Sequence, residues 1–247
     1  KFGSQGRPEM KTLRLTVIGV WVGLLTGCVS APKIIPGKGA VYGVVKAASH
    51  KDMVAKAAQS SDPLYSIGGK INYTKDMINY PELKELYVCL VDPGYQGGRE
   101  HHLATAGEGM SLRSLAVAPG DTIRIKNQTS KVQNFYIVDR LEDIQVFPPM
   151  PPGKEGSITV RLEGILELQS EDDENLVTTV LSKPGLIPRR VGSGTRYSFE
   201  KLDPETYDVI FWFWRLGAIH RQAVVEKEKN TRLDQVLSVD QFFQNKQ

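Results

Sequence analysis

Short runs in which apolar and polar residues alternate follow one another from residue 41 almost to the C-terminus. The side chains of a β-strand point alternately to its two faces, so this pattern predicts strands. Gly, Pro, Asn and Asp separate the runs, as expected of turns. The predicted strands are residues 41–47, 85–91, 112–118, 122–127, 134–138, 157–164, 165–170, 176–182, 196–202, 206–214 and 223–228. Together they predict a mainly β protein built from antiparallel sandwiches.

Three segments add to this pattern. Residues 50–60 and the tail from Leu233 onward are predicted to be helical. The run TYDVIFWFW (206–214) is apolar at consecutive positions from Val209 onward, with its two phenylalanines on one face and its two tryptophans on the other. Such a strand is typically buried on both faces. A sugar-stacking platform is the alternative interpretation of this run.

The N-terminal region has the layout of a secretory signal peptide. Residues 1–9 show no pattern and precede Met10, after which come two basic residues and the apolar run 16–25. That run is shorter than the ~20 residues of a membrane-spanning helix. It ends in Leu-Thr-Gly-Cys, which resembles the bacterial lipobox, whose cysteine receives a diacylglycerol. The resemblance implies that residues 1–27 are upstream residues and a removed signal peptide, and that Cys28 is the lipidation site.

Removing this leader changes the charge of the chain. Four basic residues and Glu9 give residues 1–27 a net charge of +3, which equals the formal net charge of +3 of the whole sequence. The remaining protein is therefore formally neutral, and it contains no basic stripe interleaved with aromatic residues. We therefore expect no nucleic-acid partner. Residues 28–39 are rich in Pro, Gly and Lys and are predicted to be a tether between lipid and fold.

The cysteines bear on redox chemistry. The sequence has two, and lipidation would consume Cys28. Cys89 then has no partner for an intramolecular disulfide, and it stands in the apolar run LYVCLVD. A buried, unreactive thiol is the expected role of Cys89.

Several motifs in collinear order resemble those of cupredoxin-like domains. They are VAPGDTI at 117–123, Asn127 followed by Gln133-Asn134-Phe135, PGKEGSITV at 152–160 and GILELQS at 164–170. A further stretch, YSFEKLDPETYDV at 197–209, resembles the carboxypeptidase-regulatory-like pattern. The resemblance, to methylamine-utilisation-type and plastocyanin-like exported proteins, implies an antiparallel Greek-key cupredoxin-like sandwich over residues 40–182. It implies a small β-sandwich unit with the C-terminal tail over 183–247.

The resemblance also implies where copper ligands would stand, and the sequence departs from it there. Gln133 and Asp173 occupy the two histidine positions, Ser170 the cysteine position and Leu176 the methionine position. A blue-copper site needs two imidazoles and a thiolate with a weak axial ligand. Residues 127–182 contain neither Cys nor His, so a small alignment shift does not restore the ligands. We therefore expect a cupredoxin-like scaffold without copper and with no other cofactor.

Other candidate sites have simpler interpretations. His101 and His102 are adjacent imidazoles, but neighbours on an extended chain point apart, so a solvated loop is favoured over a metal site. The acidic run 171–174 lacks the ligand spacing of a calcium loop. No residues suited to acid–base or nucleophilic chemistry stand out, so the chain is expected not to be an enzyme.

Two functions are compatible with these patterns. The favoured one is a non-enzymatic envelope lipoprotein whose β-domains bind an envelope protein or polysaccharide or serve a structural role. By resemblance to the lipoprotein sorting rule of enteric bacteria, Val29 and Ser30 after the cysteine imply the outer membrane, with the protein facing the periplasm or the cell surface. The alternative is a periplasmic copper-binding or electron-transfer protein with a non-standard site that uses His101, His102 and a methionine such as Met110 or Met150.

Lipidation can be tested directly at Cys28. Cells producing the wild-type chain should incorporate labelled fatty acid into it, because the lipobox cysteine is the acceptor. The Cys28→Ala variant should incorporate none and should be unprocessed or unanchored. A Cys89→Ala variant is the matched control and should be labelled normally. Absence of label from the wild type would contradict the lipoprotein interpretation.

Overall fold

The computed structural model describes residues 31–49, 66–67, 70–71, 78–107 and 109–238. Within them the protein is almost entirely β-structure, and the single helical element is the 3-10 turn η1 (Tyr80–Glu82). The predicted mainly β fold is thus confirmed. The helix expected over 50–60 lies outside the described residues. The helix expected from Leu233 is wrong, because strand β19 (Gln235–Ser238) pairs there with β1.

The first sandwich joins the two ends of the described chain, and we call it the terminal sandwich. In one sheet β1 (Gly39–Ala48) is flanked by β15 (Thr195–Leu202) on one side and by β18 (Asn230–Arg232) and β19 on the other. The facing sheet has the order β14 (Leu186–Val191), β4 (Leu86–Val91), β16 (Thr206–Phe213) and β17 (Gly217–Val224).

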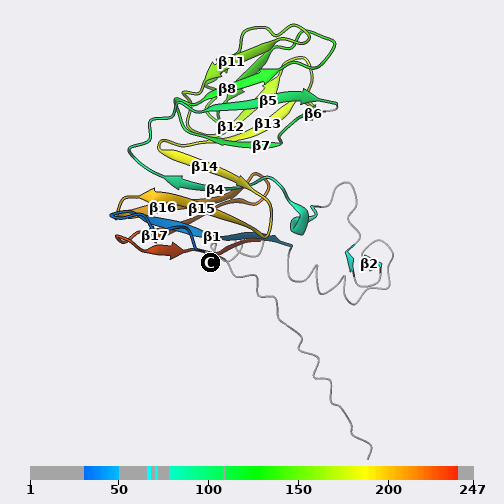
Figure 1. Ribbon diagram of the computed structural model, residues 1–247. Helices are drawn as coiled ribbons and strands as arrows, with labels where there is room; N and C mark the ends of the chain where they lie inside the picture. The colour runs from blue at the N-terminus through cyan, green and yellow to red at the C-terminus, as the bar shows by residue number, and fades with distance from the viewer. Residues whose placement is uncertain (1–30, 50–65, 68–69, 72–77, 108, 239–247) are drawn as a thin grey trace, which may run out of the picture.

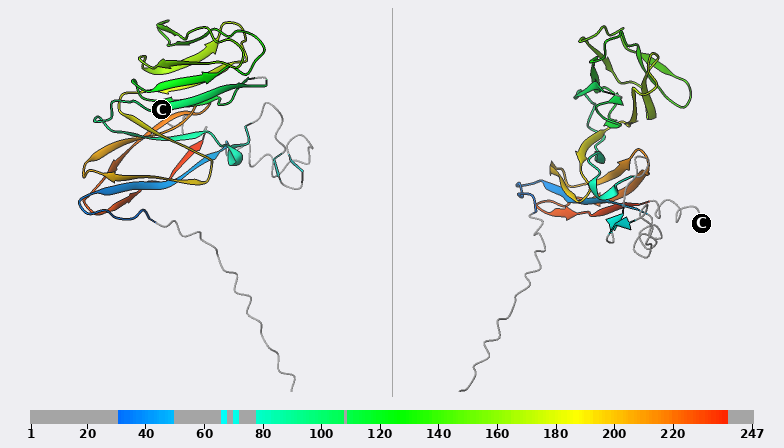
Figure 2. Two further views of the ribbon diagram at one scale, coloured as in Figure 1. Left: turned by 45° about the horizontal axis from the view of Figure 1, so that its top comes forward. Right: turned by 90° about the vertical axis from the view of Figure 1, so that its right-hand side faces the viewer.

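The second sandwich lies between β4 and β14 in sequence, and we call it the inserted sandwich. One sheet has the order β11 (Glu155–Thr159), β8 (Thr122–Lys126), β5 (Glu100–Ala106) and β6 (Gly109–Met110). The other has the order β10 (Ile144–Val146), β9 (Phe135–Val138), β12 (Gly164–Ser170), β13 (Val177–Ser182) and β7 (Ser114–Val117). Figure 1 shows this sandwich in green above the terminal sandwich, and Figure 2 shows the same separation from two further sides.

Most of these strands pair antiparallel, as predicted. Among the described pairs, β1 with β18, β1 with β19, β5 with β8, and β7 with β13 run parallel. A short separate hairpin joins β2 (Ser66–Ile67) and β3 (Lys70–Ile71).

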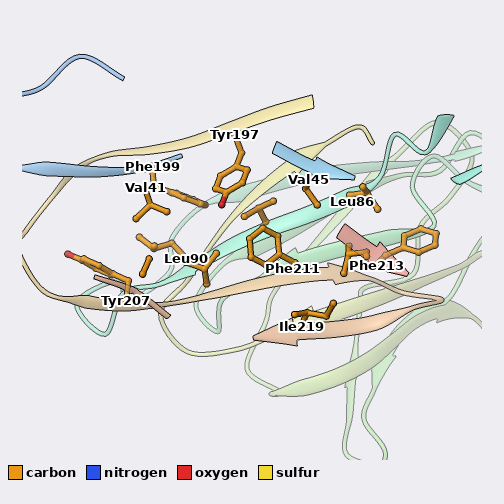
Figure 3. Packing of buried hydrophobic residues seen from close by; sticks show 14 of the residues in the cluster. Val41, Val45, Leu86, Leu90, Tyr197, Phe199, Tyr207, Phe211, Phe213 and Ile219 are labelled. Carbon is orange, nitrogen blue, oxygen red and sulfur yellow. The ribbon is translucent and has the colours of Figure 1, made fainter. Parts of the chain in front are cut away.

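The strand pairing divides the chain differently from the predicted ranges 40–182 and 183–247. Strand β1 pairs with β15, and β4 pairs with β14 and β16, so both N-terminal strands complete a sandwich with the C-terminal strands. Their inward side chains explain why. Val41, Val45, Leu86 and Leu90 share one core with the aromatic side chains of β15 and β16. Figure 3 shows these side chains between the two sheets.

The region predicted to be a tether over residues 28–39 is described from residue 31. Its backbone and side chains are held by the C-terminal part of the chain. The Asn230 Nδ2 donates to the Pro32 carbonyl oxygen at 2.8 Å, and the Gly37 N–H donates to Glu228 Oε1 at 3.2 Å. Described residues of this segment are thus fastened to the terminal sandwich.

Strand β16 is buried on both faces, as predicted from its sequence. Phe211 and Phe213 point into the core of the terminal sandwich, whereas Trp212 packs on the opposite side of the sheet. There it belongs to a junction cluster with Tyr87 and Cys89 of β4 and with small residues of the inserted sandwich. The Tyr87 and Trp212 rings lie 5.6 Å apart, and the Tyr87 hydroxyl donates to the Ser114 carbonyl oxygen at 2.9 Å.

Two properties of the junction follow from residue size and burial. Ala116 and Ala118 are fully buried at the contact, and their short side chains allow the inserted sandwich to approach the outer face of β4 and β16. Cys89 lies in the same cluster as a free, completely buried thiol, and burial raises its pKa far above the usual range. The expectation that the Cys89 thiol is buried is confirmed.

Across the described ranges, no helix has both the length and the apolar character that crossing a membrane requires.

The junction can be tested through Trp212. Replacing Trp212 by Ala should lower the free energy of unfolding by about 3–5 kcal/mol, because it empties a large buried site between two sheets. Urea unfolding followed by far-UV circular dichroism measures this loss. The matched control is Val224→Ala on β17, where the side chain is exposed and the change should stay within about 0.5 kcal/mol. Equal effects of the two substitutions would contradict the burial of Trp212 between the two sandwiches.

Candidate functional site

The residues at the four presumed ligand positions gather at one end of the inserted sandwich. Gln133 lies just before β9 and forms an isolated β-bridge with Met150. Ser170 is the last residue of β12, and Asp173 and Leu176 belong to the turn that leads to β13. The Ser170 N–H donates to the Leu176 carbonyl oxygen at 3.2 Å, and the Leu176 N–H to the Asp173 carbonyl oxygen at 3.0 Å.

Two of these side chains are in direct contact. The Ser170 hydroxyl donates to Gln133 Oε1 at 2.7 Å, and both residues are buried. The Gln133 Nε2 in turn donates to Thr129 Oγ1 at 3.2 Å, and the Ser170 oxygen accepts from the Asp172 N–H at 3.1 Å. A buried amide and hydroxyl that satisfy each other are stable without a ligand. We call Gln133, Ser170, Thr129 and Asp172 the polar plug.

The other two positions contribute differently. Leu176 packs into the core of the inserted sandwich. The Asp173 carboxylate oxygen Oδ1 accepts from the Asn175 N–H at 3.0 Å and from Asn175 Nδ2 at 3.1 Å, which closes the turn. The neighbouring Asp172 accepts from the backbone and side chain of Asn134. These two carboxylates of the acidic run therefore organise the turn through local hydrogen bonds.

Asn127 holds the loop that carries Thr129. Its Nδ2 donates to the carbonyl oxygens of Lys131 and Met150 at 2.8 and 2.7 Å, and its Oδ1 accepts from the Thr129 N–H and hydroxyl. Sequence reasoning missed the role of Thr129. The available signal was the Asn-x-Thr spacing, which favours a turn closed by side chains.

The two adjacent histidines point in different directions, as expected for an extended chain. The expected solvated loop is wrong, because both residues lie on strand β5 and pair with β8. The His101 Nε2 lies 3.0 Å from Asp121 Oδ2, whereas the His102 Nε2 lies 3.8 Å from Glu100 Oε2. Met110 and Met150 are both buried in the core of the inserted sandwich. Within the described ranges, no group of three or more His, Cys, Asp or Glu side chains is arranged to hold a metal ion.

Asp121 is the most heavily hydrogen-bonded acid of the inserted sandwich. Its completely buried carboxylate accepts from the Tyr95 hydroxyl and the Arg99 N–H at Oδ1, and from the Ala118 N–H at Oδ2, besides its contact with His101. Burial by itself would raise the pKa of Asp121, but the combined hydrogen bonds hold it below its ordinary value. Burial and the bond to Asp121 raise the pKa of Tyr95 to about 12.

A groove of about 410 Å³ lies at the boundary of the two sandwiches. It is lined by the η1 segment, by Arg113 of the inserted sandwich and by Trp214 and Arg215 after β16. The Arg215 guanidinium lies 4.7 Å from the centre of the Trp214 ring. Trp214, and not the buried Trp212, is therefore the tryptophan of the 206–214 run that borders a groove.

A second recess, of about 480 Å³, lies on the outer face of β1. Its cations are Lys46, Arg196 and Arg232, and its single acid is Asp234. Sequence reasoning missed it, because these residues come from β1, β15 and the C-terminal strands and meet only through long-range pairing.

Comparisons with known proteins leave the chain without a family assignment. No family model matches the sequence, and no curated protein matches it either. Solved structures that match include a reduced Cu(I) form of an amicyanin variant, at 17% identity over 38% of this chain and 91% of that chain, with a TM-score of 0.31. Another reduced amicyanin variant matches at 15% identity over 40% of this chain and 99% of that chain, also with a TM-score of 0.31. Likeness at this level does not assign a function.

The pH dependence of stability tests the Asp121 interactions. The lowered pKa means that the ionised carboxylate stabilises the fold above the unfolded-state pKa of about 3.9, and that this contribution is lost as the pH falls through the folded-state pKa. Asp121→Asn should lower the free energy of unfolding by about 1–3 kcal/mol at neutral pH. The new amide nitrogen is a donor and would face N–H or O–H donors that now bind the carboxylate. The difference from the wild type should shrink below about pH 4.

Urea unfolding between about pH 2.5 and 7 measures this difference. Glu171→Gln, which removes an exposed carboxylate of the acidic run, is the control. A penalty for Asp121→Asn that stays constant over the whole pH range would contradict the assigned role of the carboxylate.

Proposed function

We propose that this chain is a non-enzymatic lipoprotein of the cell envelope whose inserted sandwich is a copper-free, cupredoxin-like binding or structural module. The observation that carries the proposal is the polar plug. The positions that the sequence resemblance assigns to copper ligands lie together in space, and the buried pair among them is joined by the hydrogen bond from Ser170 to Gln133.

The chemistry of the four presumed ligand positions supports a copper-free state. A type-1 site needs a thiolate and two imidazoles, and their charge and softness bind copper. Here the corresponding side chains are a hydroxyl, an amide, a carboxylate engaged in a turn and an aliphatic group. Inserting a metal would break the bond between Gln133 and Ser170 and leave buried polar groups without partners, at a cost of about 1–3 kcal/mol each.

The proposal places the module outside the cytoplasm through Cys28, on an outer membrane and facing the periplasm or the surface. Its partner would be an envelope protein or a polysaccharide, and the groove beside Trp214 combines a partly exposed aromatic ring with charged groups. Co-purification from membranes that carry the wild-type chain would identify the partner. Trp214→Ala should reduce the yield of a partner that binds in this groove.

Copper titration tests the module. Purified protein incubated with Cu(II) and dialysed should retain little metal and show no strong visible band. The combined variant Gln133→His, Ser170→Cys, Asp173→His and Leu176→Met should gain copper affinity and a thiolate charge-transfer band. The gain is expected to be partial, because full copper affinity also needs neighbouring groups that orient the new ligands.

The double variant Ser170→Cys and Leu176→Met is the matched control, since it introduces the sulfur ligands without either histidine. It should bind copper more weakly and without the blue colour. A stoichiometric blue species formed by the wild type would overturn the copper-free assignment and favour a non-standard electron-transfer site instead.

A further inference from the structure

The N-terminal segment is fixed against one face of the terminal sandwich. Pro32 accepts the hydrogen bond from Asn230, and Lys38 forms an ion pair with Asp203 at 2.5 Å. Ala31 and Pro32 also line a recess of about 320 Å³ with Tyr42 and Arg196, which lie on the outer face of β1 and β15. The chain therefore begins its described course on this face.

The distance from this point to Cys28 is short. A fully extended chain spans at most about 3.6 Å per residue, so Cys28 lies within about 11 Å of Ala31 whatever path the three intervening steps take. A lipid on Cys28 thus could not place a membrane far from the outer face of β1. The inserted sandwich lies at the opposite end of the molecule, beyond the sheet that contains β4 and β16 (Figure 1).

The composition of this face suits an anionic lipid surface. Lys46, Arg196 and Arg232 outnumber Asp234 in the β1 recess and Glu200 in the adjoining recess, so the charged residues that line the two recesses have a formal net charge of +1. Asp234 is engaged by Arg232 at 2.8 Å and by the Val44 N–H at 2.9 Å, so its charge is locally compensated. Val236 lies beside these charged groups and is 40% exposed.

We infer that the outer face of β1, β15 and β19 is a membrane-contact surface that rests on anionic phospholipid headgroups. The inference rests on the proposed lipid anchor, which would hold this face at the membrane. Each cation near an anionic membrane strengthens binding by about fivefold. The diacylglycerol on Cys28 would hold the chain at the bilayer, and the basic face would add electrostatic attraction to anionic headgroups. The face thereby orients the inserted sandwich away from the bilayer.

A labelling experiment tests the orientation. The protein is recovered from producing cells in its processed form and placed on vesicles of phosphatidylglycerol and phosphatidylcholine that contain a spin-labelled headgroup lipid. A fluorophore is attached at Val236→Cys in the β1 recess or, as a control, at Leu141→Cys in the inserted sandwich. Both native positions are exposed, and Cys89 is buried and does not compete for the label. Lipidation blocks the Cys28 sulfur, and if no lipid is attached the experiment is repeated with Cys28→Ala in every variant.

Quenching should be several-fold stronger at position 236 than at position 141. It should fall to the level of position 141 in the charge-reversed variant Lys46→Glu with Arg232→Glu, on vesicles of phosphatidylcholine alone, and at about 1 M salt, where the Debye length is about 3 Å. The matched control Lys131→Glu with Arg140→Glu makes the same change of net charge on the inserted sandwich. It should leave quenching at position 236 unchanged.

The outcomes separate this inference from the anchor on which it rests. Fatty-acid incorporation is measured on the same preparations. Quenching confined to position 236 and abolished by the charge reversal supports the contact surface, even if no lipid is attached to Cys28 and the anchor fails. Equal quenching at the two positions, or quenching indifferent to the charge reversal, overturns the contact surface while a labelled Cys28 leaves the anchor intact.

Discussion

The burial of both faces of the sheet that contains β4 and β16 is the constraint on which the rest of the structure depends. One face supplies Phe211 and Leu90 to the core of the terminal sandwich, and the other supplies Trp212 and Tyr87 to the junction. Water is excluded from both sides, so the two sandwiches share one apolar layer. The groove beside Trp214 and the separation of the β1 face from the inserted sandwich both follow from this sharing.

The strands that the sequence predicts well are those with strong local patterns. Alternation or apolar runs located β4, β8, β9, β12, β13, β15 and β16 to within a few residues. Strand β5 was missed because its sequence EHHLATA is largely polar, and only its fit against β8 makes it a strand. Strand β14 was missed because it contains Pro188. Proline is tolerated there because β14 is an edge strand that pairs with β4 alone.

The order of the strands in the sequence did not indicate which strands pair in the same sheet. Local patterns carry no information about a partner far along the chain, so β1 and β4 were grouped with the strands that follow them directly. The candidate site shows the same division. Residue types at 133 and 170 already argued against copper, but the hydrogen bond that joins them, the contribution of Thr129 and the basic recess on β1 exist only after long-range pairing.

The insertion of one sandwich between two strands of the other has a consequence for the order of folding. Tyr42 pairs with Ser198, so the terminal sandwich cannot form until the C-terminal strands are available. The inserted sandwich has all of its strands within residues 100–182 and can close first. Its closure shortens the effective loop between β4 and β14 and lowers the entropy cost of bringing them together. Until then β1 and β4 are unpaired apolar strands, which makes this interval the stage at which the chain is most exposed to aggregation.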